Sequence, residues 1–127
     1  METTIFDIHR RARIYLTDDA EKSIYTWDGH AVACLNGEQV YGWHGRHLGW
    51  FVDGILYDGR GYRVGFTAEN CPEAPYDEPP KHSKHGQTQR FKHGAPYARV
   101  TFSQGNSPQD LDAFIRQDAP YRLAETN

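Results

Sequence analysis

Histidines are the side chains of this sequence best suited to metal binding, and three of the seven lie close together. His82 and His85 are three residues apart, and His93 follows eight residues later. Structural zinc sites usually combine such histidines with cysteines at tight spacing. Here the histidines alternate with lysines in a proline-rich stretch. The pattern therefore predicts a solvated loop and no metal site.

Residue combinations that could carry catalysis are also weakly supported. Cys34 and Cys71 lie far apart and are typical of two free thiols in a reducing compartment. Asp53 and Asp58 are close in sequence, but Asp53 falls in an expected turn, which weakens a two-carboxylate acid–base pair. No Ser/His/Asp order stands out, and no glycine-rich phosphate loop precedes a helix. We therefore predict no catalytic residue and no cofactor, and we favour a protein that is not an enzyme.

Aromatic residues, by contrast, are dense between Trp43 and Phe51, with polar side chains beside them. Aromatic walls with a few convergent polar groups are the usual makeup of a small-molecule site, and such rings also stack on quaternary ammonium groups. The candidate ligand-binding residues are Trp43, His44, Arg46, His47, Trp50, Tyr57 and Asp58. The alternative is that the rings pack the core and that the histidines and the arginine are solvated.

These candidates belong to a repeat of sixteen residues. Tyrosines recur at positions 25, 41 and 57, glycines at 29, 45 and 61, and aliphatic residues at 32, 48 and 64. Extending the period backwards predicts a degenerate first copy, with Ile8 and Leu16 as its aliphatic residues. In that copy His9 and Arg13 take the tyrosine and glycine places.

Turn signals follow the same period. Asp-Gly or Asn-Gly pairs at 28–29, 36–37 and 53–54 supply the positive φ values of tight hairpin turns. Short strands between such turns form an up-and-down meander. Pairing across the first turn puts Tyr25 opposite Val32, and the same register puts Tyr41 opposite Leu48 and Tyr57 opposite Val64. One face of each hairpin then carries both an aromatic and an aliphatic side chain.

The character of the sequence changes after Cys71. Prolines at 72, 75, 79 and 80 interrupt regular structure, and we expect residues 72–92 to be the most mobile part of the chain. Residues 97–102 could form a last short strand. Ser107 is the expected N-cap of a helix that ends near Gln117 and docks its apolar stripe on the meander. The expected organisation is a four-hairpin domain at 1–71, a proline-rich linker or loop at 72–96, and a short strand and helix at 97–127.

The run from Gly42 to Phe66 resembles the 4-fold β-flower proteins, which are small, mostly bacterial proteins. Its most specific part is residues 47–51, followed by Asp53-Gly54 and residues 55–58. The resemblance covers about residues 5–71. It implies a mainly β fold of four repeated hairpins in a pseudo-fourfold rosette, with a short C-terminal α-helix. It implies no particular activity.

Composition limits the partners. Lysine and arginine number 14 against 17 acidic residues, so the net charge of −3 leaves no basic excess for nucleic acid. No apolar run approaches the roughly twenty residues of a membrane span, and the N terminus lacks the pattern of a signal peptide. We expect a cytoplasmic binding module for a small molecule or a protein.

Two alternatives stay open. One is a small hydrolase or metal-dependent enzyme that uses His44, His47 and Asp58. The other is a homo-oligomer that associates through an uncovered edge strand or through the helix stripe.

Overall fold

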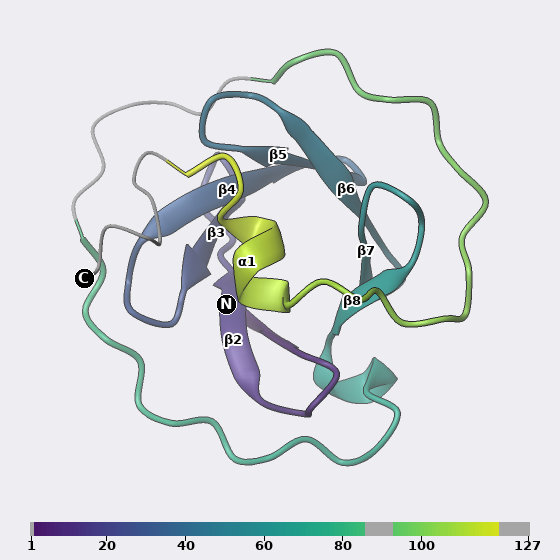
Figure 1. Cartoon of the computed structure of the whole chain (residues 1–127). Helices are drawn as coiled ribbons and strands as arrows, with labels where there is room; N and C mark the ends of the chain where they lie inside the picture. Colours follow the sequence, from purple (N-terminus) through teal and green to yellow (C-terminus); the bar gives the residue numbers. More distant parts are fainter. Residues whose placement is uncertain (1, 86–92, 120–127) are drawn as a thin grey trace.

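The computed structural model describes residues 2–85 and 93–119, and its centre is a closed antiparallel barrel (Figure 1). Each strand pairs with its neighbours in chain order, and β1 closes the ring against β8 through Phe6 and Phe66. The strands are β1 (Thr3–Phe6), β2 (Ala12–Leu16), β3 (Ser23–Thr26), β4 (Ala31–Asn36), β5 (Gln39–Gly42), β6 (His47–Val52), β7 (Ile55–Tyr57) and β8 (Arg63–Phe66). A 3-10 turn (Ala68–Asn70) and the helix α1 (Leu111–Ile115) follow. The predicted fold class is confirmed.

The four hairpins share one turn geometry, which gives the barrel its fourfold character. The turns span residues 7–11, 26–30, 42–46 and 58–62, and we call them the first to fourth turns. In each, the first residue donates its N–H to the carbonyl of the fifth, and its own carbonyl accepts from the fourth. The fourth residue has a positive φ, at Arg10, Gly29, Gly45 and Gly61.

The predicted strand register holds at the open end of each hairpin and is wrong beside the turn. Ile24 pairs with Ala33, as the prediction implies, but Tyr25 pairs with Ala31 because a β-bulge leaves Val32 unpaired. The same shift pairs Tyr41 with His47 and Tyr57 with Arg63. A bulge turns the extra side chain towards the other face. Aliphatic side chains therefore point into the barrel, whereas the tyrosines point outwards.

The predicted first copy is wrong in its position. Its strands are β1 and β2, and Ile8 and His9 lie in the first turn. Arg10, with a φ of 68°, takes the place that glycine has in the other turns, and Arg13 is the residue of β2 that the bulge leaves unpaired. Phe6 therefore corresponds to Tyr25, nineteen residues later, because the β2–β3 connection (17–22) is longer than the connections at 37–38 and 53–54.

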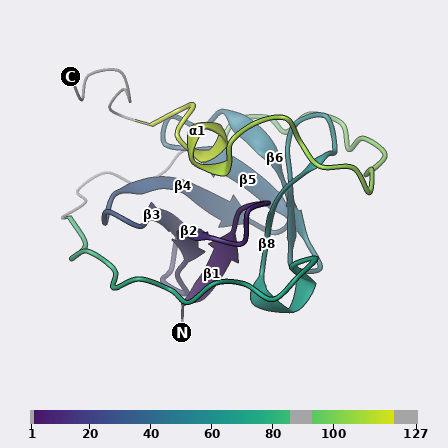
Figure 2. The ribbon, with the colours of Figure 1, turned by 60° about the horizontal axis from the view of Figure 1, so that its bottom comes forward.

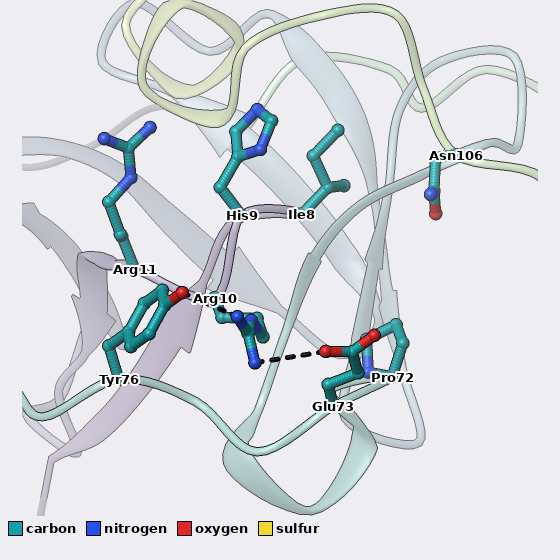
Figure 3. Close-up of a pocket in the computed structure, with 8 residues that line it drawn as sticks. All are labelled: Ile8, His9, Arg10, Arg11, Pro72, Glu73, Tyr76 and Asn106. Atoms are coloured by element: carbon teal, nitrogen blue, oxygen red, sulfur yellow. Dashed lines mark hydrogen bonds and ion pairs between the residues drawn. The ribbon is translucent and has the colours of Figure 1, made fainter.

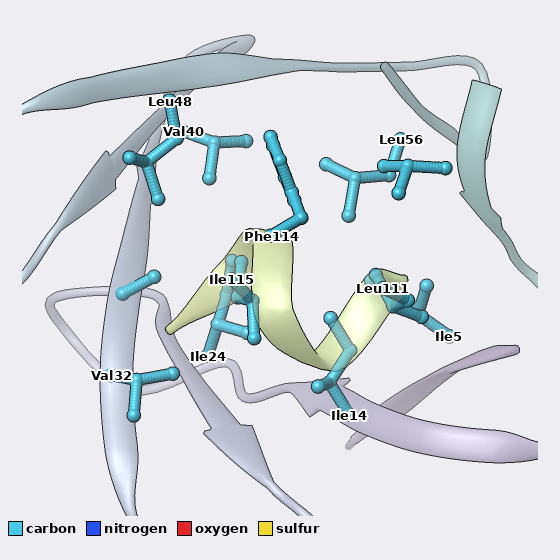
Figure 4. Close-up of a cluster of buried hydrophobic side chains, with 12 residues drawn as sticks. Ile5, Ile14, Ile24, Val32, Val40, Leu48, Leu56, Leu111, Phe114 and Ile115 are labelled. Atoms are coloured by element: carbon cyan, nitrogen blue, oxygen red, sulfur yellow. The ribbon is translucent and has the colours of Figure 1, made fainter. Parts of the chain in front are cut away.

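Helix α1 closes one end of the barrel, opposite the N terminus (Figure 2). Its buried residues Leu111, Phe114 and Ile115 project among the inward aliphatic side chains (Figure 4). The core comprises Ile5, Ile14, Ile24, Val32, Ala33, Val40, Leu48, Leu56, Val64, Leu111, Phe114 and Ile115. The docking of the helix stripe is as predicted. The N-cap is Asp110 and not Ser107, and the helix ends at Ile115.

The described parts of the segment between the barrel and α1 pass around the outside of the barrel (Figure 1). We call its described residues, 72–85 and 93–106, the belt. They contain no regular strand, so the strand expected at 97–102 is wrong. The belt donates one backbone hydrogen bond to the positive-φ residue of every turn. The four bonds are Tyr76 N to Arg10 O, His85 N to Gly29 O, Gly94 N to Gly45 O and Ser103 N to Gly61 O, at 2.8–2.9 Å. The expected mobility of 72–92 stays a prediction, and residues 86–92 lie outside the described residues.

Both surfaces expected to serve self-association are occupied. The closed ring leaves no unpaired edge among the described strands, and the helix stripe is buried in the core. Neither surface is therefore free to pair with a second copy of the chain. Among the described residues, no helix has the length and apolar content needed to cross a bilayer.

Candidate functional site

The exposed members of the predicted site lie on the third turn, and the C-terminal segment holds that turn. The first residue of this turn is Gly42, which has no side chain to accept the turn's N–H groups. Asp118 supplies the acceptor instead, since its Oδ2 receives His44 N at 2.9 Å and Arg46 N at 3.1 Å. His44 Nδ1 lies 3.4 Å from Asp118 Oδ1. Trp43 is half-buried and packs against the cluster of Tyr15, Tyr25 and Ala31.

A second group of predicted site residues lies under the belt. His47 is 5% exposed, and its ring lies 4.9 Å from that of Trp50. Tyr97 of the belt donates its backbone N–H to His47 Nδ1 at 3.1 Å. Tyr57 stacks on Phe102 of the belt at 4.0 Å. These rings are covered by the chain itself.

Asp58 belongs to the fourth turn and is fully buried. Its Oδ1 accepts the N–H groups of Arg60 and Tyr62, and its Oδ2 accepts the Ser107 hydroxyl at 2.6 Å. Asp58 thus ties the start of the helical segment to the barrel. Within residues 2–85 and 93–119, no hydrogen bond or ion pair joins it to His44 or His47, the partners that the hydrolase alternative requires.

Metal and thiol chemistry find little support in the described structure. Across these residues no cluster of three or more histidine, cysteine, aspartate or glutamate side chains could hold a metal ion. Burial raises the pKa of the Cys34 thiol to about 12, which keeps it protonated although His93 Nε2 lies 3.5 Å from its sulfur. A reactive cysteine needs the opposite shift in pKa.

A broad hollow lies at the first turn, away from the predicted candidates. It is an open pocket of about 640 Å³ between this turn and the start of the belt (Figure 3). The lining residues are Ile8, His9, Arg10, Arg11, Pro72, Glu73, Tyr76 and Asn106. We call it the first-turn pocket.

Arg10 contacts two of the other residues that line this pocket. Its Nη1 lies 3.1 Å from Glu73 Oε1, its Nη2 donates to the Tyr76 hydroxyl at 2.6 Å, and its guanidinium lies 4.4 Å from the centre of the Tyr76 ring. Tyr76 and Ile8 are exposed by 54% and 38%, so the pocket also has an apolar wall. Arg11 is largely exposed, with its Nε 3.7 Å from Asp7 Oδ2. The pocket can therefore receive a group that is negatively charged at one end and apolar beside it.

Comparison with known proteins identifies the family. The 4-fold beta flower protein family matches residues 3–115, which is most of the chain. The chain belongs to this family. No curated protein and no solved structure matches it. The match extends through the belt and α1, beyond the residues on which the sequence resemblance rests.

The beta flower barrel explains why sequence reasoning missed the first-turn pocket. Arg10 and Arg11 were visible as a pair of cations, but the expected period put the first turn at Arg13. The other wall comes from Glu73 and Tyr76, more than sixty residues away, and nothing in their local sequence predicts that contact. Arg10 takes the repeat's glycine position only because the longer β2–β3 connection shifts the first copy by three residues, so the sixteen-residue period alone could not find it. The binding role predicted for the seven candidate residues stays a prediction.

Proposed function

We propose that this protein is a non-enzymatic binding module that recognises an acidic segment of a partner protein through the first-turn pocket. The observation that carries the proposal is the Arg10–Glu73 ion pair. It places a carboxylate of the chain itself against a guanidinium inside the first-turn pocket. Guanidinium groups suit this role because their fork of donors matches a carboxylate.

The Glu73 carboxylate occupies the position that a carboxylate of the ligand would take, and the ligand can displace it. Its side chain is 73% exposed, and an exposed ion pair contributes only about 0–1 kcal/mol. A carboxylate of a bound peptide can therefore take its place at little cost. Arg11 then offers a second guanidinium, and Ile8 and Tyr76 offer apolar contact for the aliphatic part of an acidic side chain.

The net charge of the chain makes the pocket selective. Because the whole chain carries −3, acidic peptides are not attracted to its surface in general. Binding must then depend on the local arginines, and it should weaken with added salt as exposed ionic contacts do.

Calorimetric titration with an N-acetylated, C-amidated tetraglutamate peptide tests the proposal, with the tetraglutamine peptide as the neutral control. Arg10→Gly removes the guanidinium while keeping a residue suited to the φ of 68°. Arg11→Ala removes the second cation, and Arg46→Ala removes the arginine at the same place in the third turn. We expect Arg10→Gly and Arg11→Ala each to weaken binding about tenfold, which corresponds to about 1.4 kcal/mol, and Arg46→Ala to leave it unchanged. Equal binding of both peptides, or equal loss in all three variants, would refute the proposal.

A further inference from the structure

The outer face of β2 and β3 carries an aromatic cluster that is independent of the first-turn pocket. Tyr15 and Tyr25 are directly opposed across the two strands, and their rings stack with centres 5.5 Å apart and planes 7° from parallel. Trp27, just beyond β3, meets the Tyr15 ring edge-on at 5.7 Å. Two π faces and an indole are thus held together by the pairing of the sheet.

Two ammonium groups of the belt occupy this cluster. Lys81 Nζ lies 4.4 Å from the Tyr15 ring centre and 5.4 Å from that of Trp27. Lys84 Nζ lies 5.2 Å from Tyr25 and 5.8 Å from Tyr15. All four distances are within the range of cation–π attraction.

One carboxylate completes the arrangement. Glu2 accepts Lys81 Nζ on Oε1 at 2.8 Å and Lys84 Nζ on Oε2 at 2.6 Å. We call Tyr15, Tyr25, Trp27 and Glu2 the cage. Two positive charges share its single carboxylate, so one of them is in excess.

The corresponding rings of the other hairpins are covered differently. Tyr41 stacks on His93 of the belt at 4.9 Å, and Tyr57 stacks on Phe102 at 4.0 Å. Flat rings from the belt thus cover these two tyrosines. Tyr25, at the same place in the repeat, has no such stacked ring from the described belt and faces a flexible ammonium instead. Among these three described tyrosines, Tyr25 is therefore the one that a cation covers.

We propose that the cage binds an organic monocation of the alkylammonium class, whose substituted head group replaces the ammonium of Lys84 over Tyr15 and Tyr25. Lys84 is the exchangeable occupant because its side chain is 45% exposed and its Nζ lies further from the rings than that of Lys81. The exchange leaves the belt in place, since His85 N still donates to Gly29 O at 2.9 Å.

Hydration favours the substituted cation. A primary ammonium is a compact and strongly hydrated charge that loses water when it approaches a ring. A tetraalkylammonium is more weakly hydrated, and its alkyl groups also gain apolar contact with the rings. The Glu2 carboxylate supplies the countercharge, which an uncharged ligand of the same shape cannot use.

The probe for the test is tetramethylammonium chloride, followed by NMR through the upfield ring-current shift of its methyl protons. Its uncharged counterpart is tert-butanol, and sodium chloride keeps the ionic strength constant. Wild type is compared with Lys84→Ala, which empties the position, and with Lys22→Gly, which removes the same charge at a positive-φ residue of the β2–β3 connection. We expect saturable binding in wild type, about tenfold tighter binding in Lys84→Ala, no change in Lys22→Gly, and no saturable binding of tert-butanol.

Ring variants in the Lys84→Ala background identify the source of binding. Tyr25→Phe keeps the π face and should retain affinity, whereas Tyr25→Leu keeps apolar bulk and should lose most of it. Absence of saturable tetramethylammonium binding in Lys84→Ala would overturn the proposal. Equal binding of tert-butanol would also overturn it, and this comparison stands even if Tyr25→Leu fails to fold.

Discussion

At the residue scale, carboxylates accept the N–H groups of three of the four barrel turns, and they come from two sources. Asp7 Oδ1 accepts the N–H groups of His9 and Arg11 in the first turn, and Asp58 does the same in the fourth. In the third turn Gly42 leaves this place open, and Asp118 fills it from the C-terminal segment. A Cβ on Gly42 would lie 2.3 Å from Cβ of Asp118, so one position in space serves either residue.

This exchange predicts a compensating pair of substitutions. Asp118→Gly should lower the free energy of unfolding by roughly 2 kcal/mol, since two N–H groups lose a charged acceptor. Gly42→Asp alone should also destabilise, because its side chain collides with Asp118. The double variant should be more stable than either single variant in urea unfolding, with Asp77→Gly, an exposed belt residue, as the control. Additive losses in the double variant would show that the two carboxylates are not equivalent.

His47 should make stability depend on pH. Burial lowers the pKa of its ring, and the Tyr97 N–H already occupies Nδ1, which therefore has to stay unprotonated. The unfolded chain then binds this proton more tightly than the folded protein does, so stability is lost as pH falls below about 6.5 and levels off below the lowered native pKa. Urea unfolding of His47→Gln at pH 7.5 and 5 should show a smaller loss than wild type. His9→Gln, on the exposed first turn, should retain the full loss, and identical losses in His47→Gln and wild type would contradict this assignment.

At the element scale, the sequence predicts where the hairpins lie, but it does not predict the β-bulges that set their pairing beside the turns. The sixteen-residue period of Tyr25, Tyr41 and Tyr57 places three of the four hairpins, because side-chain identity repeats where the environment repeats. The bulges at Val32 and Leu48 were invisible, since a bulge adds a residue without changing the period. The helix stripe was predictable from Leu111, Phe114 and Ile115. Its place inside the barrel was not, because nothing in its local sequence identifies the distant strand residues, such as Gly49, that it packs against.

Helix α1 should contribute to stability mainly by filling one end of the barrel with its buried side chains. A Cβ on Gly49 would lie 3.2 Å from Cζ of Phe114, which shows how closely the helix fits the wall. Phe114→Ala should cost about 3–5 kcal/mol, the range for removing a buried phenyl ring. The exposed Ala113→Ser on the same helix is the control. Denaturant unfolding measures the free energy of unfolding of both variants. A loss below about 1 kcal/mol for Phe114→Ala would mean that the barrel does not depend on the buried ring of α1 for its stability.

At the scale of the whole molecule, the belt connects the four turns into one ring of contacts. Its four hydrogen bonds to the turns join backbone groups, so they do not depend on side-chain identity, and this explains why composition alone suggested a linker. We expect limited proteolysis to cut first within 72–92, where the described side chains are largely exposed. The fragments should stay together on a sizing column, because the C-terminal fragment keeps its contacts with the barrel through Gly94, Ser103 and α1. Early cleavage inside 24–66 would contradict this expectation.

The central functional claim is that the first-turn pocket, and not the aromatic run from Trp43 to Phe51, receives the ligand. The most direct measurement is a two-dimensional amide NMR titration of the intact wild-type protein with the acetylated tetraglutamate peptide. The account predicts saturable shifts for residues 8–11 and for Glu73 and Tyr76, with the third-turn amides at 43–46 unchanged. Shifts centred on the third turn, or no saturable shift in the first turn, would contradict it.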